Sequence, residues 1–489
     1  MEIENLSVDA VVVGAGVLGL AISRALAAHG MSVACVGPDH TTPGTASSAA
    51  GAMLSPISEI SPDWDKKGNL EELEFRIRSS AYYADFLLAL NEDDGGSVFY
   101  TPGSVVIANL VNESDRRTLA AMRAAAHRYG LRAEPMDPDD VPGLRPARGY
   151  DAFEALFLPE EGAVDTVQLL RRLDGLIRAT PRAHRIDTFV SELLRAGDRI
   201  VGARTAGGSL ISAPVVVLAA GAGVQALMDG VREACPGLPR LLAGKGVSAV
   251  VTGMPMAYPH VVRTPNRDFA CGTHVVPRGD GSIYIGATNR ISGTPGSADS
   301  VTPGEVHSLL HAAMHEINTG FRAAAFRSVT YGMRPLTTDY HPLVGRTPVP
   351  GLYVATGTYR NGLLMAPLIA DIVSREVRSG APADDNPFPA DGRLRPANPL
   401  GDSIAGIVEE GIGHLASFLL EPGGHLPYDR YRELRSFLIA LGRVATDEDD
   451  SERAVLRSKF AATPMSEIVP QLFYELADRE RAAPQDTRR

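Results

Sequence analysis

The sequence predicts an α/β protein with one parallel sheet, a second mixed or antiparallel sheet and a helical extension at the C-terminal end. Three observations support this prediction. A short apolar strand, a glycine-rich turn, a helix and a second strand follow one another over residues 9–36. Short strand-like segments recur between residues 241 and 288. Beyond a proline-rich stretch at residues 378–399, apolar side chains recur at helical spacing.

The composition narrows the classes of function. A chain of 489 residues is long enough for two or three domains. Its net charge of −11 argues against non-specific nucleic-acid binding, and an anionic substrate would need a local arginine. The three cysteines are isolated, so we expect reduced thiols and no metal site. The apolar run at residues 11–20 is too short to span a membrane, and we expect a cytoplasmic protein.

The remaining elements follow from hydrophobic periodicity. We predict helices near residues 70–90, 117–129, 166–177 and 434–441, and a last strand–loop–helix unit from residue 354 to about residue 378. We predict strands near residues 185–190, 200–205, 215–219, 241–251, 269–276 and 283–288.

The first glycine-rich turn has the spacing Gly14-x-Gly16-x-x-Gly19. The first glycine allows the tight turn, the second lets a pyrophosphate approach the backbone, and the third lets the helix pack closely on the strand. The helix that opens at Val17 and Leu18 offers N–H groups and a dipole to the anion. Because the turn lies between a strand and a helix, it predicts a Rossmann-type dinucleotide site.

The end of the second strand departs from this pattern. The position that usually carries an acidic residue for the adenosine ribose is Gly37. Asp39 could reach the ribose from two positions later, or backbone groups and water could replace it. The sequence leaves both alternatives open.

Four further segments identify the family. They are a small-residue run at 46–56, a strand and glycine turn at 215–223, Gly-Met-Arg-Pro at 332–335, and the stretch 341–367. In this order and spacing they resemble the D-amino acid oxidase superfamily of flavoproteins, most closely its glycine oxidase branch. The resemblance covers roughly residues 8 to 380. It implies FAD as the cofactor.

The resemblance also implies further FAD contacts. The small-residue run would lie against the isoalloxazine, and the N-terminus of the last helix would favour negative charge at flavin N1/O2. The implied contacts are Ser47, Ser48, Ala50, Gly51, Ala52, Met53, Val190, Ala220, Gly221, Gly357, Arg360, Asn361, Gly362 and Leu363.

The implied substrate site centres on Arg334, which matches the family's carboxylate clamp. A guanidinium binds a carboxylate in a planar, bidentate way and stays charged when buried. Arg360 matches a second arginine near the same pocket. His274 replaces a tyrosine common in relatives, and it could bind a polar substrate, shift the pH dependence near neutrality, or simply pack. His341 also departs from the usual small residue, with a structural or a substrate-tuning role left open.

The resemblance implies oxidation of the C–N bond of a small amine or amino acid. Hydride would pass from Cα to flavin N5, the resulting imine would hydrolyse, and oxygen is the expected electron acceptor. The alternatives are an N-demethylase or amine dehydrogenase of the same family, or a non-catalytic flavoprotein that acts as an interaction module.

The resemblance divides the chain into two interleaved domains. We expect an FAD-binding domain from residues 1–95, 150–235 and 330–380, and a substrate domain from residues 96–149 and 236–329. Residues 381–399 are expected to be a linker and residues 400–489 a helical extension. The extension could pack on its own FAD-binding domain, form a homo-oligomer or bind a partner protein.

Overall fold

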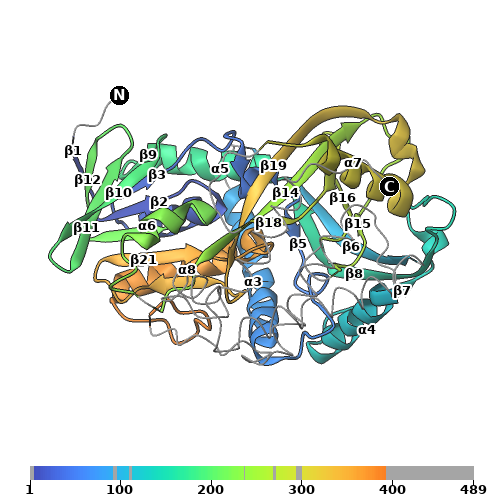
Figure 1. Ribbon diagram of the computed structural model, residues 1–489, viewed down its shortest axis with the longest axis horizontal. Coiled ribbons are helices and arrows are strands. Elements are labelled where there is room, and N and C mark those ends of the chain that lie inside the picture. Colours follow the sequence, from blue (N-terminus) through green and yellow to red (C-terminus); the bar gives the residue numbers. More distant parts are fainter. Residues whose placement is uncertain are drawn as a thin grey trace, which may run out of the picture.

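The computed structural model describes residues 5–91, 96–109, 113–235, 237–267, 271–292 and 300–391. These residues form a mixed α/β structure, which confirms the predicted fold class. A parallel sheet lies at one end of the molecule, a large mixed sheet lies at the other, and helix α3 runs between them (Figure 1). The predicted C-terminal extension and the end of the linker fall outside the described residues.

The first sheet, within the described residues, has six strands in the order β20-β21-β13-β2-β3-β9. All its neighbours pair in parallel except β20, which is antiparallel to β21. Its strands are β2 (Ala10–Val13), β3 (Val33–Val36), β9 (Ala183–Ile186), β13 (Val215–Leu218), β20 (Leu343–Arg346) and β21 (Leu352–Thr356). The central strands are continuous apolar runs, as expected for a parallel sheet that is covered on both faces.

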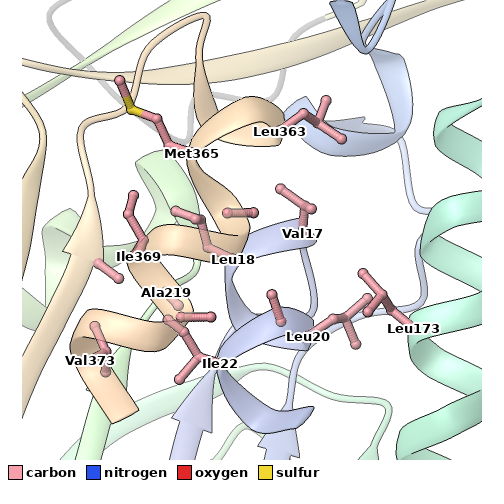
Figure 2. Packing of buried hydrophobic residues seen from close by; sticks show 14 of the residues in the cluster. Val17, Leu18, Leu20, Ile22, Leu173, Ala219, Leu363, Met365, Ile369 and Val373 are labelled. Carbon is pink, nitrogen blue, oxygen red and sulfur yellow. The ribbon is translucent and has the colours of Figure 1, made fainter. Parts of the chain in front are cut away.

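Helix α1 (Val17–Ala28) packs between α8 (Gly362–Ser379) and α5 (Thr166–Ala179). Figure 2 shows the apolar side chains of these three helices directed toward one another over the sheet. Close packing requires glycine at the start of α1, because a Cβ on Gly19 would lie 1.9 Å from the carbonyl oxygen of Gly14. This contact sets the glycine turn directly against the helix.

The large sheet has, within the described residues, eleven strands, of which β4-β19-β14-β17-β16-β15-β6-β8-β5 form the main path. Strand β18 adds to β14, and β7 adds to β8. The strands are β4 (Gly44–Thr45), β5 (Met53–Leu54), β6 (Tyr100–Asn109), β7 (Glu134–Met136), β8 (Ala152–Val164), β14 (Leu241–Thr252), β15 (Val261–Arg263), β16 (His274–Pro277), β17 (Ile283–Gly286), β18 (Arg290–Ser292) and β19 (Ala325–Thr337). The long antiparallel pair β14–β19 reaches from this sheet toward the parallel one (Figure 1).

A small outer sheet has the order β1-β12-β11-β10, with β1 (Asn5–Ser7), β10 (Val190–Ala196), β11 (Arg199–Thr205) and β12 (Leu210–Ser212). The other helices are α2 (Ala46–Ala49), α3 (Lys67–Asn91), α4 (Glu113–Arg128), α6 (Gln225–Asp229), α7 (Pro303–Ala312), the π-helix η3 (Ala313–Ile317) and the 3₁₀ turns η1 (Pro138–Asp140), η2 (Gly221–Val224) and η4 (Thr319–Ala323). Among the helices described, none is both long and apolar enough to cross a membrane.

Two segments differ from the sequence-based expectation. Strand β8 was assigned to the FAD-binding part, but it pairs with β6 in the large sheet. We therefore infer that the chain changes sheets near residue 165 rather than 150. Residues 381–391, the first part of the expected linker, pack against the parallel sheet, where the N–H of Val344 donates to the carbonyl of Phe388 at 3.0 Å. Phe388 is buried, so composition alone was misleading there.

The close packing at Gly19 predicts that alanine there and alanine at a second helical glycine, Gly175, change the free energy of unfolding in opposite directions. Gly19→Ala should lower the free energy of unfolding by about 1–3 kcal/mol, because its methyl group meets rigid backbone. Gly175→Ala, in α5 with no neighbour in reach of the new methyl group, should raise it by about 0.5–1 kcal/mol. Thermal unfolding of the two variants checks this, and equal shifts would contradict the close contact.

Candidate active site

A cavity of about 470 Å³ extends from the glycine turn, past α2, to strand β19 and the N-terminus of α8. Many of the predicted site residues line it: Gly14, Gly16, Val17, Leu18, Ser47, Ala50, Val190, Ala220, Gly221, Arg334, Arg360, Gly362 and Leu363. The other predicted site residues are not among those that line it: Gly19, Asp39, Ser48, Gly51, Ala52, Met53, His274, Gly357 and Asn361. The fold thus brings segments that are far apart in sequence to one elongated cavity.

The glycine turn forms part of the cavity wall. Gly14 has a φ of +119°, and a Cβ there would lie 2.5 Å from the carbonyl oxygen of Ala219. The backbone N–H of Val17, at the start of α1, donates to Oγ of Ser47 at 3.0 Å. The small-residue segment is therefore tied to the helix N-terminus, where the helix dipole favours an anion.

The structure explains why Gly37 carries no acidic side chain. A Cβ at this position would lie 2.5 Å from the backbone nitrogen of Ala15. Asp39 is not among the residues that line the cavity, and its Oδ1 accepts hydrogen bonds from the N–H and hydroxyl of Thr41 at 2.8 and 2.6 Å; a contact with the ribose stays a prediction. His40 lines the cavity instead. The buried guanidinium of Arg185 donates to the carbonyls of Gly37 and neighbouring residues and so holds this turn.

The small-residue segment is held from the side of the large sheet. The carbonyl of Ala49, at the end of α2, accepts hydrogen bonds from the hydroxyls of Tyr284 (2.9 Å) and Ser248 (3.1 Å). Ala52 then turns the chain with a φ of +54°. Ser47 and Ala50 remain on the cavity wall, where their short side chains leave room for a ring system.

The N-terminus of α8 closes another side of the cavity. Gly357 has a φ of +73°, and a Cβ there would lie 2.6 Å from Thr337. The side-chain amide of Asn361 donates to Glu72 at 3.1 Å. Asn361 thus leaves the first N–H groups of α8, near Gly362 and Leu363, uncapped by its own side chain.

Arg334 lies on β19 opposite Gly244 of β14 and lines the cavity. Its Nη1 donates to the carbonyl of Thr288 and to Oδ1 of Asn289, both at 3.0 Å. Gly246 makes room for the guanidinium, because a Cβ there would lie 2.2 Å from Nη2. Among the residues that the structure describes, no carboxylate lies within ion-pair distance of Arg334.

Arg360 lines the same cavity as Arg334, but its guanidinium contacts an aromatic side chain. Its Nη2 donates to the Tyr359 hydroxyl at 3.2 Å, and its guanidinium lies 4.6 Å from the centre of that ring. The nearby carboxylate of Glu59 pairs with buried Arg263 and accepts from Asn266 at 2.9 Å. Burial alone would raise the pKa of Glu59, but Arg263 and then Arg360 lower it to about 2, so this group stays ionised.

His274 is buried between the sheet and the small-residue segment. Its Nδ1 lies 3.0 Å from the carbonyl of Gly272, so Nδ1 carries the proton and Nε2, toward Gly51 and Gly286, is an acceptor. Burial, and then the charge of Arg263, lowers the pKa of His274 to about 3. We infer that His274 stays neutral and does not tune the pH dependence near neutrality.

The side chain of His341 packs among residues of neighbouring elements. Its ring stacks on Phe388 with centroids 5.8 Å apart, and its Nδ1 lies 3.5 Å from the carboxylate of Glu72. These contacts join α3, which carries Glu72, the segment between β19 and β20, which carries His341, and the segment after α8, which carries Phe388. Of the two roles left open by the sequence, the structure favours the packing role.

Residues 9–376 match the family model described as FAD-dependent oxidoreductase, which is three quarters of the chain. The chain belongs to this family. The glycine oxidase of Pseudomonas aeruginosa is 30% identical over 406 residues, covering 80% of this chain and all of the relative. The bifunctional ThiO/ThiG protein of a Nostoc species is 27% identical over 75% of this chain, which spans about half (52%) of that relative's length.

Solved structures agree with this assignment. The crystal structure of glycine oxidase from Geobacillus kaustophilus superposes with a TM-score of 0.66 at 26% identity, covering 80% of this chain and 100% of that chain. An iminodiacetate oxidase from a Chelativorans species has the same fold, with a TM-score of 0.66 at 21% identity over 79% of this chain and 100% of that chain.

FAD fits the cavity of this family member. The turn at Gly14 and Gly16 provides backbone without side chains where a pyrophosphate would lie, and α1 begins beside it. Val190, the residue expected at the adenine, also lines the cavity. Ser47 and Ala50 face the part of the cavity that leads to Arg334, where the flavin ring would lie.

Sequence reasoning missed several residues that shape the site. They are Gly244, Gly246, Asn289, Tyr359, Glu59 and Arg263. A local signal was available for Gly244 and Gly246: two glycines two positions apart in one strand lie on the same face, where another group can approach the backbone closely.

The depressed pKa of His274 predicts a pH-dependent stability. Between about pH 6.5 and 3 the unfolded chain binds a proton that the folded chain does not, so stability should fall as the pH falls through this range. At pH 5 the loss relative to pH 7 should reach up to about 2 kcal/mol. In His274→Gln this part of the loss should disappear, as measured by urea unfolding at both pH values. Exposed His127→Gln is the control, and equal pH dependence in both variants would contradict the assignment.

Proposed function

We propose that this chain catalyses FAD-dependent oxidation of the C–N bond of a small amine that carries a carboxylate, such as glycine or a D-amino acid. The observation that carries the proposal is Arg334, a cation at the cavity wall whose described partners are neutral oxygens. Such a group is suited to an anionic ligand. The similarity to a glycine oxidase over that relative's whole length supports the same reaction class.

Arg334 has the role of binding the substrate carboxylate through its planar guanidinium. This contact would orient the substrate Cα toward the part of the cavity beside Ser47 and Ala50. FAD supplies, when bound, the acceptor for the hydride on that carbon. The oxidised substrate is an imine, which water hydrolyses to a keto acid and ammonia, and oxygen is the proposed final electron acceptor.

The protein contributes positioning and charge rather than proton transfer by a side chain. His274 is neutral, and its N–H is already used by the carbonyl of Gly272. The N-terminal N–H groups of α8, at Gly362 and Leu363, favour negative charge in the adjoining cavity. A preorganised site can supply both positioning and charge without a movement of its groups during the reaction.

The test is flavin reduction without oxygen. The purified holoprotein is mixed with glycine, sarcosine, D-amino acids and larger carboxylated amines, and bleaching of the visible flavin bands is followed by stopped flow. One of these amines should reduce the wild type. Arg334→Ala should then lower the second-order reduction rate constant roughly 10²–10³-fold, because a charged hydrogen-bonded pair is lost.

Arg327→Ala is the matched control, because Arg327 lies on the same strand with an exposed side chain paired to Asp280. It should reduce at the wild-type rate. A wild-type flavin that stays oxidised with every amine would count against the proposed substrate class. Equal rates for Arg334→Ala and the wild type would remove the clamp from the proposal.

A further inference from the structure

Asn289 lies between the two arginines of the cavity. Its Oδ1 accepts from Nη1 of Arg334 at 3.0 Å, and its Nδ2 donates to the hydroxyl of Tyr359. That hydroxyl also accepts from Nη2 of Arg360 at 3.2 Å. Three hydrogen bonds therefore connect Arg334 to Arg360 through two side chains that neither the reaction nor the cofactor motifs account for.

The fold makes room for this chain of hydrogen bonds. Asn289 follows β17 and is only 6% exposed. A Cβ on Gly244 would lie 3.0 Å from both Oδ1 of Asn289 and the ring of Tyr359, so glycine in β14 leaves space for the two side chains. Asn289 and Tyr359 therefore pack against the backbone of β14 at Gly244, beside Arg334.

Tyr359 is held in a conformation that side chains rarely adopt. Its φ is +45°, and its backbone N–H donates to the carbonyl of Pro335 at 2.8 Å, directly after Arg334. Such strain persists only where the surrounding structure over-determines it, and it is often found at functional sites. Here it directs the Tyr359 hydroxyl to the point where Asn289 and Arg360 meet.

The side-chain amide of Asn289 both accepts and donates hydrogen bonds without carrying a charge, which neither a carboxylate nor an aliphatic side chain can do. A carboxylate at this position would pair with Arg334 and cancel the charge that an anionic ligand needs. An aliphatic side chain would remove one of the two acceptors of Nη1 of Arg334 and one of the two hydrogen bonds to the Tyr359 hydroxyl. A neutral amide accepts from the arginine and donates to the tyrosine, so it orients both while the arginine remains a net cation.

We propose that Asn289, supported by Tyr359, is a positioning residue that holds the Arg334 guanidinium in place and leaves its positive charge for the substrate carboxylate. The proposal rests on the proposed function, since it assigns Arg334 to an anionic group. It adds a residue that does not itself contact the substrate. Its consequence is that ligand affinity depends on the charge and hydrogen bonding at position 289.

The test measures binding of a carboxylate that cannot be oxidised. Oxidised holoprotein is titrated with acetate and with benzoate, and the dissociation constant is taken from the perturbation of the visible flavin spectrum. Asn289→Asp, almost the same shape, should weaken binding roughly 30-fold or more, because the new carboxylate competes for Arg334. Asn289→Leu should weaken it roughly 3- to 10-fold through loss of the hydrogen bond.

Two further variants separate positioning from general damage. Tyr359→Phe keeps the ring and should weaken carboxylate binding a few-fold, about 2- to 5-fold, with a smaller change in the limiting rate of flavin reduction by an amine. Asn69→Asp adds the same charge at an exposed site on α3 and should bind like the wild type. Flavin content and thermal unfolding show that each variant is folded and loaded.

The outcomes distinguish this inference from the proposed function. Wild type that binds the carboxylates, with Asn289→Asp and Asn289→Leu binding equally well, overturns the role of Asn289 and leaves the proposed function intact. Wild type that binds no carboxylate and is reduced by no amine overturns both. An Asn289→Asp variant that loses its flavin leaves the decision to Asn289→Leu and Tyr359→Phe, whose unchanged affinity would equally overturn the inference.

Discussion

The antiparallel pairing of β14 with β19 is the constraint on which the site depends. Its register places Gly244 opposite Arg334 and Gly246 opposite Gly332. Glycine at 246 leaves the space that the guanidinium fills, and glycine at 244 leaves space for Asn289 and Tyr359 beside it. A slip of one residue would turn Arg334 to the other face of the sheet, since side chains alternate along a strand. The binding end of the cavity therefore exists only in this register.

The charges around the cavity are arranged in two groups. Glu59 and Arg263 form a buried pair close to Arg360, and the low pKa of Glu59 keeps that pair ionised. Arg334, by contrast, is surrounded by neutral acceptors within the described residues. A locally positive site in a chain of net charge −11 would concentrate the proposed anionic substrate at one place while the remaining surface repels it.

Local patterns predicted the parts of the fold that local interactions build. The glycine turn was predicted from its spacing, and the small-residue segment and the last helix from the resemblance to the family; the three meet at one cavity. Strand β8 was not assigned to its sheet because its Pro-Glu-Glu-Gly stretch (159–162) is typical of a loop. Glu161 of this strand can be buried because its carboxylate accepts hydrogen bonds from the N–H groups of Ile57 and Ser58, which lie more than a hundred residues earlier in the chain.

The sequence by itself determined the family, the cofactor motif and the arginine of the proposed carboxylate clamp, because each depends on residues that are neighbours in the chain or recur at a set order. Only the tertiary structure showed the burial of His274, the hydrogen bonds of Asp39 to Thr41 and the contacts of Asn289. Asn289 meets Arg334 across 45 residues and Tyr359 across 70. Contacts of this kind leave no period or motif in the chain, since they arise only when distant strands are brought into register.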